Sequence, residues 1–216
     1  MSYPSPGCRR GFEVESHRMT SNTPAPLPLL DGEEASSQSR AAMERGRASA
    51  GTLINMYRGM AHAPGLLDTY LDGSTRFRTE SGFSTTEQEV VFISISRGNN
   101  CTYCVAGHSA LATRRGVDSQ VIEALREGRP LDDPRYEVLR TITLETMAGQ
   151  GHLNPGLLEQ FISAGYRTDQ VLYIILAIGL KVLSNSTNHY LHTPLDESFS
   201  RHIWHGENAS RVTLDQ

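Results

Sequence analysis

Apolar and polar positions follow a helical period over most of this chain, from residue 39 onward. Apolar residues recur three and four positions apart, and Pro or Gly marks the boundaries between segments. β-branched runs such as VVFISIS follow a helix-capping signal, and no turn dipeptide stands between alternating strands. The sequence therefore predicts an all-α fold of about eight helices. Apart from a cysteine-containing stretch at 97–111, the helical segments are 39–50, 52–63, 64–78, 84–97, 119–128, 133–151, 154–165 and 167–192.

The two ends of the chain lack this helical pattern. Residues 1–38 hold five of the ten prolines and many Ser and Thr, which predicts a flexible N-terminal arm. Met19 offers an alternative start within this arm, and we give Cys8 no role. We expect one helical domain over residues 39–200 and a C-terminal tail over 201–216.

Charge and composition narrow the classes of function. The net charge is −4 and the charged runs are short and mixed in sign, so we expect neither a nucleic-acid nor a membrane partner. The longest apolar run, VLYIILAIGL at 171–180, is shorter than the ~18 residues of a membrane helix, and no apolar signal region begins the chain. We expect a cytoplasmic protein with reduced thiols, where a close cysteine pair is catalytic or metal-binding. No phosphate-cradling glycine motif is present, so no nucleotide or flavin is expected.

The stretch RGNNCTYCVAGHSAL, residues 97–111, concentrates the candidate chemistry. The Asn pair after Gly98 is expected to end one helix and cap the next, which puts Cys101 and Cys104 where a helix dipole stabilises a thiolate. Cys101, Cys104 and His108 then share one helical stripe. His108 is spaced to take the Cys104 proton, and Cys101 is spaced to form a disulfide with an oxidised Cys104.

Glu89 is the fourth candidate residue. It enters the apolar run VVFISI just after Glu87, which fits a capping box with Ser84. A buried Glu89 that accepts a hydrogen bond from His108 would fix the imidazole tautomer and raise its basicity. A solvated acid in the first helical turn, favoured by the helix dipole, is the other interpretation. The spacing alone leaves both open.

The segment EVVFISISRGNNCTYCVAGH resembles the signature of the carboxymuconolactone decarboxylase superfamily, in its alkylhydroperoxidase D-like (AhpD-like), peroxidase-related branch. That signature is a Glu followed twelve residues later by CxxCxxxH. MYRGMAHAPGLLDTYL and SNSTNHYLHTPLDESF resemble its flanking segments, so the similarity covers about residues 48–200. The resemblance implies an all-helical, usually oligomeric protein. It also implies that Cys104 attacks a peroxide, Cys101 resolves the sulfenic acid, His108 is the base and Glu89 orients it.

The resemblance therefore predicts a cysteine-based peroxidase that needs no metal or other cofactor. Its partners would be a peroxide substrate, an external dithiol reductant (a thioredoxin-like or lipoyl protein) and further copies of itself. The true decarboxylases of the superfamily lack the cysteine pair, which argues against lactone decarboxylation. This chain has Tyr103 where the characterised hydroperoxidase has a His, and Tyr cannot supply the same base at neutral pH.

Three other interpretations remain open at this point. A zinc site would need Glu89, Cys8 or a second histidine to complete the ligands that Cys101, Cys104 and His108 begin. A non-enzymatic redox switch or interaction protein would use the dithiol without turnover. Ordinary core cysteines are the third possibility.

A polar patch on the last long helix is expected to line a pocket mouth or a subunit contact, or simply to be a hydrogen-bonded polar surface. Its residues are Asn185, Asn188, His189 and His192.

Overall fold

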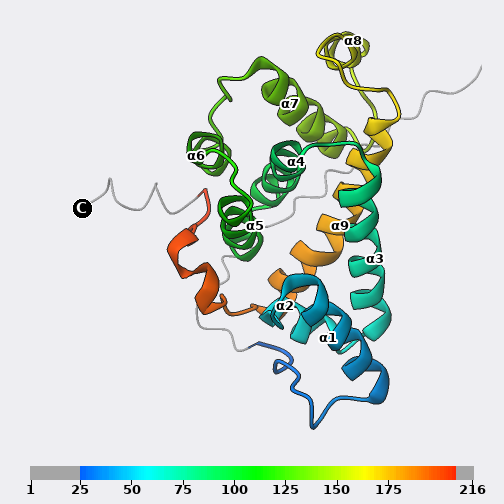
Figure 1. Cartoon of the computed structure of the whole chain (residues 1–216), viewed down its shortest axis with the longest axis vertical. Coiled ribbons are helices and arrows are strands. Elements are labelled where there is room, and N and C mark those ends of the chain that lie inside the picture. The colour runs from blue at the N-terminus through cyan, green and yellow to red at the C-terminus, as the bar shows by residue number, and fades with distance from the viewer. Residues whose placement is uncertain (1–24, 208–216) are drawn as a thin grey trace, which may run out of the picture.

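Nine α-helices and one 3₁₀ helix make up residues 25–207, the part of the chain that the structure, a computed structural model, describes (Figure 1). No strand occurs in this range, so the predicted all-α fold is confirmed, and each predicted segment overlaps an α-helix. The elements are α1 (Ser37–Ala50), α2 (Asn55–Met60), α3 (Pro64–Glu80), α4 (Thr85–Gly98), α5 (Thr102–Arg114), α6 (Ser119–Glu127), α7 (Pro134–Ala148), α8 (Pro155–Ser163), α9 (Gln170–Leu191) and η1 (Glu197–His202).

Helix α4 forms the centre of the core. It begins with the predicted capping box, in which Ser84 and Glu87 exchange hydrogen bonds of 3.3 and 2.7 Å. Ten of its 14 residues are buried, because α5, α6, α7 and α9 all pack against it (Figure 1). The start of α4 therefore carries Glu89 into the interior of the molecule.

Helices α3 and α9 run side by side along one flank of α4 (Figure 1). Gly73 of α3 permits this approach, since a Cβ there would lie 2.7 Å from the Leu180 side chain. The close packing places two basic residues, Arg78 of α3 and Lys181 of α9, next to the α4–α5 pair.

Helix α9 alone among the described helices is long and apolar enough to cross a membrane by length and composition. It contacts α2, α3, α4, α5 and α7, and its buried face carries Lys181, Asn185 and Asn188. These contacts and polar groups are those of a core helix.

The turn between α4 and α5 differs from the prediction. Asn99 ends α4, and Asn100 adopts a left-handed conformation with φ of 52°, so neither Asn caps the next helix. Cys101 itself is the N-cap of α5, in an extended conformation. So short a turn needs one residue in the left-handed backbone conformation, and Asn adopts that conformation more readily than most residues. An N-cap residue needs an extended backbone instead, so Asn100 does not cap α5.

The predicted arm and tail fall partly outside the described residues. Residues 1–24, with Cys8 and Met19, and residues 208–216 are not described. The described end of the arm lies on α2, where Arg58 and His62 hydrogen-bond the carbonyl oxygens of Leu30 and Pro28. At the other end, η1 packs on α5 and crosses the boundary expected at residue 200.

Candidate active site

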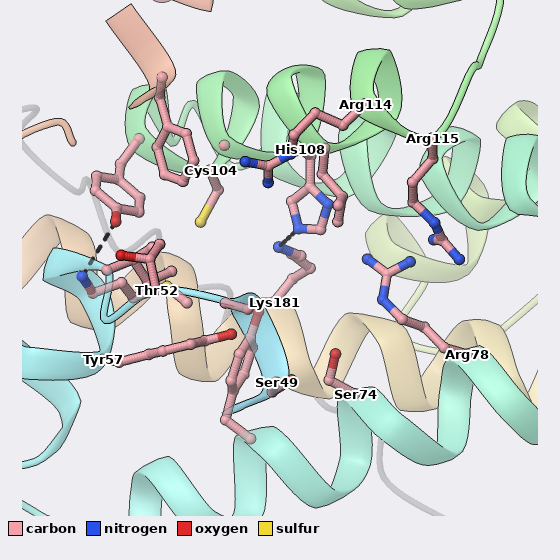
Figure 2. Close-up of a pocket in the computed structure, with 18 of the residues that line it drawn as sticks. Ser49, Thr52, Tyr57, Ser74, Arg78, Cys104, His108, Arg114, Arg115 and Lys181 are labelled. Atoms are coloured by element: carbon pink, nitrogen blue, oxygen red, sulfur yellow. Dashed lines mark hydrogen bonds between the residues drawn. The ribbon is translucent and has the colours of Figure 1, made fainter. Parts of the chain in front are cut away.

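Helix α5 presents one stripe of side chains to a cavity of about 270 Å³ that is partly open to solvent. Cys104, His108, Leu111 and Arg114 follow one another at intervals of three or four residues along this stripe. The opposite walls come from the end of α1, from α2, α3, α9 and η1, and from the segment that joins α1 to α2 (Figure 2). The cavity therefore runs along the helix that holds both candidate thiols.

The two thiols differ in what they face. Both are free and buried, but Cys104 lines the cavity and Cys101 does not. A hydrogen bond from the Cys101 thiol, followed by the charge of Lys181, lowers the pKa of Cys104 well below its ordinary value despite the burial. The same hydrogen bond, together with burial, raises the pKa of Cys101. The thiolate form is therefore favoured on the sulfur that faces the cavity.

The Glu89 carboxylate is fully buried and bound by three side chains. Its Oε2 accepts a hydrogen bond from His108 Nδ1 at 2.9 Å, and its Oε1 accepts from Arg78 at 2.9 Å and Arg115 at 3.3 Å. Burial alone would raise the pKa of Glu89, but the hydrogen bond of His108 and the charge of Arg78 lower it to about 2. The structure thus places Glu89 inward, as the first of the two interpretations requires.

His108 stands between Glu89 and Lys181. Burial, and then the charge of Lys181, lowers the pKa of the imidazole, so it is neutral at neutral pH. An ionised Glu89 can only accept, so Nδ1 carries the proton and Nε2 keeps its lone pair toward Lys181 Nζ, 2.6 Å away. The neutral ring still donates to Glu89, while the arginines keep the carboxylate ionised. The ring stacks on Phe92 at a centroid distance of 4.8 Å.

Lys181 is the functional candidate that the sequence analysis missed. It is the only lysine in the chain, it is 0% exposed, and its Nζ lies 5.1 Å from the centroid of the Phe92 ring. Burial lowers its pKa. Figure 2 shows its amine directed at His108, beside Cys104. The available signal was a lone lysine inside an apolar helix, a position where burial of a charge is costly.

The predicted polar patch divides into two parts. Asn188 donates a hydrogen bond to Cys104 Sγ at 3.2 Å, and Asn185 accepts one from Asn99 at 2.9 Å. Both are buried and do not line the cavity, so the pocket-mouth alternative does not hold for them, whereas both make hydrogen bonds, as the alternative of a hydrogen-bonded polar patch expects. His189 is exposed, and His192 ends α9 in a left-handed conformation.

Tyr103 occupies a structural position in the cavity wall. Its hydroxyl accepts a hydrogen bond from the Met56 backbone at 3.2 Å and donates one to Asp196. Burial, and then the Asp196 carboxylate, raises the pKa of the phenol. The neutral hydroxyl ties α5 to α2 and to the segment before η1, which agrees with the expectation that Tyr103 is not a base.

The donor set of a zinc site is incomplete between residues 25 and 207. No three His, Cys, Asp or Glu side chains gather there in a metal-binding arrangement. Both ring nitrogens of His108 already have protein partners. Cys8, one of the ligands considered, lies outside the described residues.

Comparison with known proteins agrees with this fold. The model of the carboxymuconolactone decarboxylase family matches residues 64–133, which include all four predicted site residues. Over these residues the chain is similar to the carboxymuconolactone decarboxylase family. The family name refers to decarboxylation, whereas the matched segment of this chain holds the two cysteines and the Glu89–His108 pair.

Two solved structures resemble this chain in fold. The alkylhydroperoxidase AhpD core of an uncharacterised peroxidase-related protein from Ralstonia eutropha JMP134 has a TM-score of 0.71 at 17% identity, and the alignment covers 83% of this chain and 96% of that one. An uncharacterised peroxidase-related protein from Silicibacter sp. TM1040 has a TM-score of 0.68 at 20% identity, with 84% and 97% covered. At these identities the likeness establishes the fold. Curated protein sequences give no significant match.

Proposed function

We propose that this protein is a thiol-dependent peroxidase in which Cys104 attacks the peroxide and Cys101 resolves the product. The observation that carries the proposal is the difference between the two thiols: only Cys104 lines the cavity, and it is the sulfur whose pKa is lowered. A low-pKa thiolate facing a small cavity is the arrangement that peroxide reduction needs. The peroxidase-related fold neighbours support the same class of reaction.

The cycle has three balanced steps. The Cys104 thiolate attacks one oxygen of R–O–O–H, the O–O bond breaks, and the products are a Cys104 sulfenic acid and an alkoxide that takes up a proton to become an alcohol. The Cys101 thiol then condenses with the sulfenic acid to give a disulfide and water. An external dithiol reduces this disulfide by exchange and is itself oxidised to a disulfide.

The groups around Cys104 divide the proton chemistry. Glu89 holds the tautomer of His108 in which Nε2 is basic, and that nitrogen faces Lys181 at 2.6 Å. The His108–Lys181 pair takes the proton that leaves Cys104 and returns one to the departing alkoxide. Lys181 and Asn188 stabilise the thiolate by charge and by a hydrogen bond. Cys101 is therefore left as the thiol that reacts second.

Turnover of cumene hydroperoxide with dithiothreitol, thioredoxin or dihydrolipoamide tests the proposal. We expect Cys104→Ser to abolish turnover, and Cys101→Ser to stop after one equivalent of peroxide with a sulfenic acid that dimedone traps on Cys104. His108→Ala and Glu89→Gln should lower turnover by roughly 10²-fold or more.

The pH dependence gives a second measurement. Because the pKa of Cys104 is lowered, its alkylation by iodoacetamide should persist below the pH at which ordinary thiols stop reacting, and should fall only as the pH drops through that lowered pKa. Full peroxidase activity in Cys104→Ser would refute the assignment. Reversible oxidation of the dithiol without turnover by any reductant would favour the redox-switch alternative.

A further inference from the structure

The wall of the cavity is strongly cationic. Arg78, Arg114, Arg115 and Lys181 all line it, and its lining contains no Asp or Glu. Arg78 and Arg115 share the Glu89 carboxylate behind the wall, and Lys181 is engaged with His108. The exposed side chain of Arg114 forms no hydrogen bond or ion pair with any residue in the described range 25–207.

These charges leave the site with a positive excess. Four cations oppose two anions, the Glu89 carboxylate and the Cys104 thiolate, so the excess is 4 − 2, or two charges. A cavity with this balance and low-dielectric walls attracts anions. Arg78 and Arg115 each donate to Glu89 through one nitrogen, whereas none of the Arg114 guanidinium donors has a partner in the described range. Guanidinium groups bind carboxylates in a bidentate manner.

We propose that the substrate is an organic hydroperoxide that carries a carboxylate, with the peroxide at Cys104 and the carboxylate at Arg114. This inference rests on the peroxidase function proposed above and adds the class of substrate to it. The carboxylate would occupy the one guanidinium of the wall that has no partner among the described residues, while the reacting oxygens meet the thiolate at the other end of the same stripe.

The geometry of α5 sets the separation between the two ends. Cys104 and Arg114 are ten residues apart, which is roughly 15 Å along a helix. Helical side chains lean toward the N-terminus, so the guanidinium lies closer to Cys104 than the Cα atoms do. Between the two ends, Leu111, Tyr70 and Phe199 give the wall an apolar surface. The substrate would therefore have an alkyl or aryl body between its acid and its peroxide.

A matched pair of peroxides tests this substrate class. Cumene hydroperoxide and 4-carboxycumene hydroperoxide differ only in a carboxylate placed across the ring from the peroxide. We expect kcat/KM to be about fivefold or more higher for the carboxylated compound, because one partly exposed guanidinium–carboxylate contact supplies about that factor. Arg114→Gln should bring the ratio of the two kcat/KM values close to one, and Arg114→Lys should keep part of the preference. Arg201→Gln removes an exposed arginine that does not line the cavity, and it should leave the ratio unchanged.

A binding measurement separates this inference from the peroxidase proposal. Isothermal titration calorimetry compares the binding of 4-isopropylbenzoate with that of the uncharged 4-isopropylbenzamide. We expect the full chain to bind the benzoate more tightly, and we expect Arg114→Gln to abolish this difference in affinity. Equal turnover of both peroxides and equal binding of both analogues would overturn the inference and leave the peroxidase proposal standing. Preferred binding of the benzoate without turnover of either peroxide would overturn the peroxidase proposal and support an anion site.

Discussion

At the scale of single residues, the unusual feature is a buried lysine in a helix that is otherwise rich in apolar residues. Lys181 is fully buried, and burial lowers its pKa. Its protonated form therefore lowers the free energy of unfolding at neutral pH. That cost shrinks as the pH rises from the lowered pKa toward the ordinary value of 10.5. Stability alone does not explain a charged side chain at this position. In the proposed function, the Lys181 charge stabilises the Cys104 thiolate.

Replacing this lysine by methionine separates the two effects. In Lys181→Met the pKa of Cys104 should rise, because a cation that stabilises the thiolate is lost. We expect the pH at which Cys104 alkylation reaches half its maximal rate to rise by about one unit, the shift that ~1.4 kcal/mol supplies. The unfolding temperature should stay the same or increase, because the desolvated charge is gone. An unchanged pH midpoint would mean that Cys101 and Asn188 suffice to stabilise the thiolate.

At the scale of elements, the short turn between α4 and α5 sets the position of the dithiol. Asn100 has φ of 52°, and its side chain also accepts a hydrogen bond from the backbone of Glu207 at 3.2 Å. The left-handed conformation is available to Gly and tolerated by Asn, but costly for a β-branched residue. The position of Cys101 as N-cap depends on this conformation.

Two substitutions at Asn100 test the turn. Asn100→Gly keeps the allowed backbone region and should leave the unfolding temperature nearly unchanged. Asn100→Val should destabilise the protein by about 1–3 kcal/mol, which denaturant unfolding would measure. If the two variants proved equally stable, the left-handed turn would not be a constraint on the fold.

Local signals predicted the elements well, since helix period, prolines, glycines and the Ser84–Glu87 capping box act within a few residues. The N-cap of α5 was mispredicted because two adjacent Asn residues can each cap a helix or turn left-handed, and only the packing of α4 against α5 decides. Glu89 could be named in advance, but its burial follows from helices that arrive later in the chain. Lys181 and Arg78 reach the site only through the α3–α9 contact, which no local pattern encodes.

At the scale of the whole molecule, homo-oligomerisation and a cytoplasmic location stay predictions. The outer face of α9 exposes a row of apolar side chains, among them Leu172 at 67%, Ile175 at 45% and Val182 at 53%. Ile175 and Val182 lie seven residues apart and so share one face of the helix. A second copy of the chain is the partner that the predicted oligomer would place on this face.

A charged pair of substitutions tests this surface. We expect Ile175→Glu with Val182→Glu to convert an oligomer to a monomer, because a buried carboxylate pair would be desolvated in the interface. Sedimentation velocity of the wild type and variant measures the change. Ile162→Glu on α8 is the matched control, since Ile162 is 46% exposed but lies on another element. A monomeric wild type would contradict the prediction.

The distribution of basic residues has a consequence for covalent modification. Apart from histidines, the only cationic side chains at the surface of this chain are arginines. Its single lysine, Lys181, is buried beside Cys104. Acylation, ubiquitin attachment and amine-directed cross-linking therefore find no ε-amino group on the outside of the folded protein. An amine-directed reagent small enough to enter the cavity would instead modify Lys181, next to Cys104 and His108.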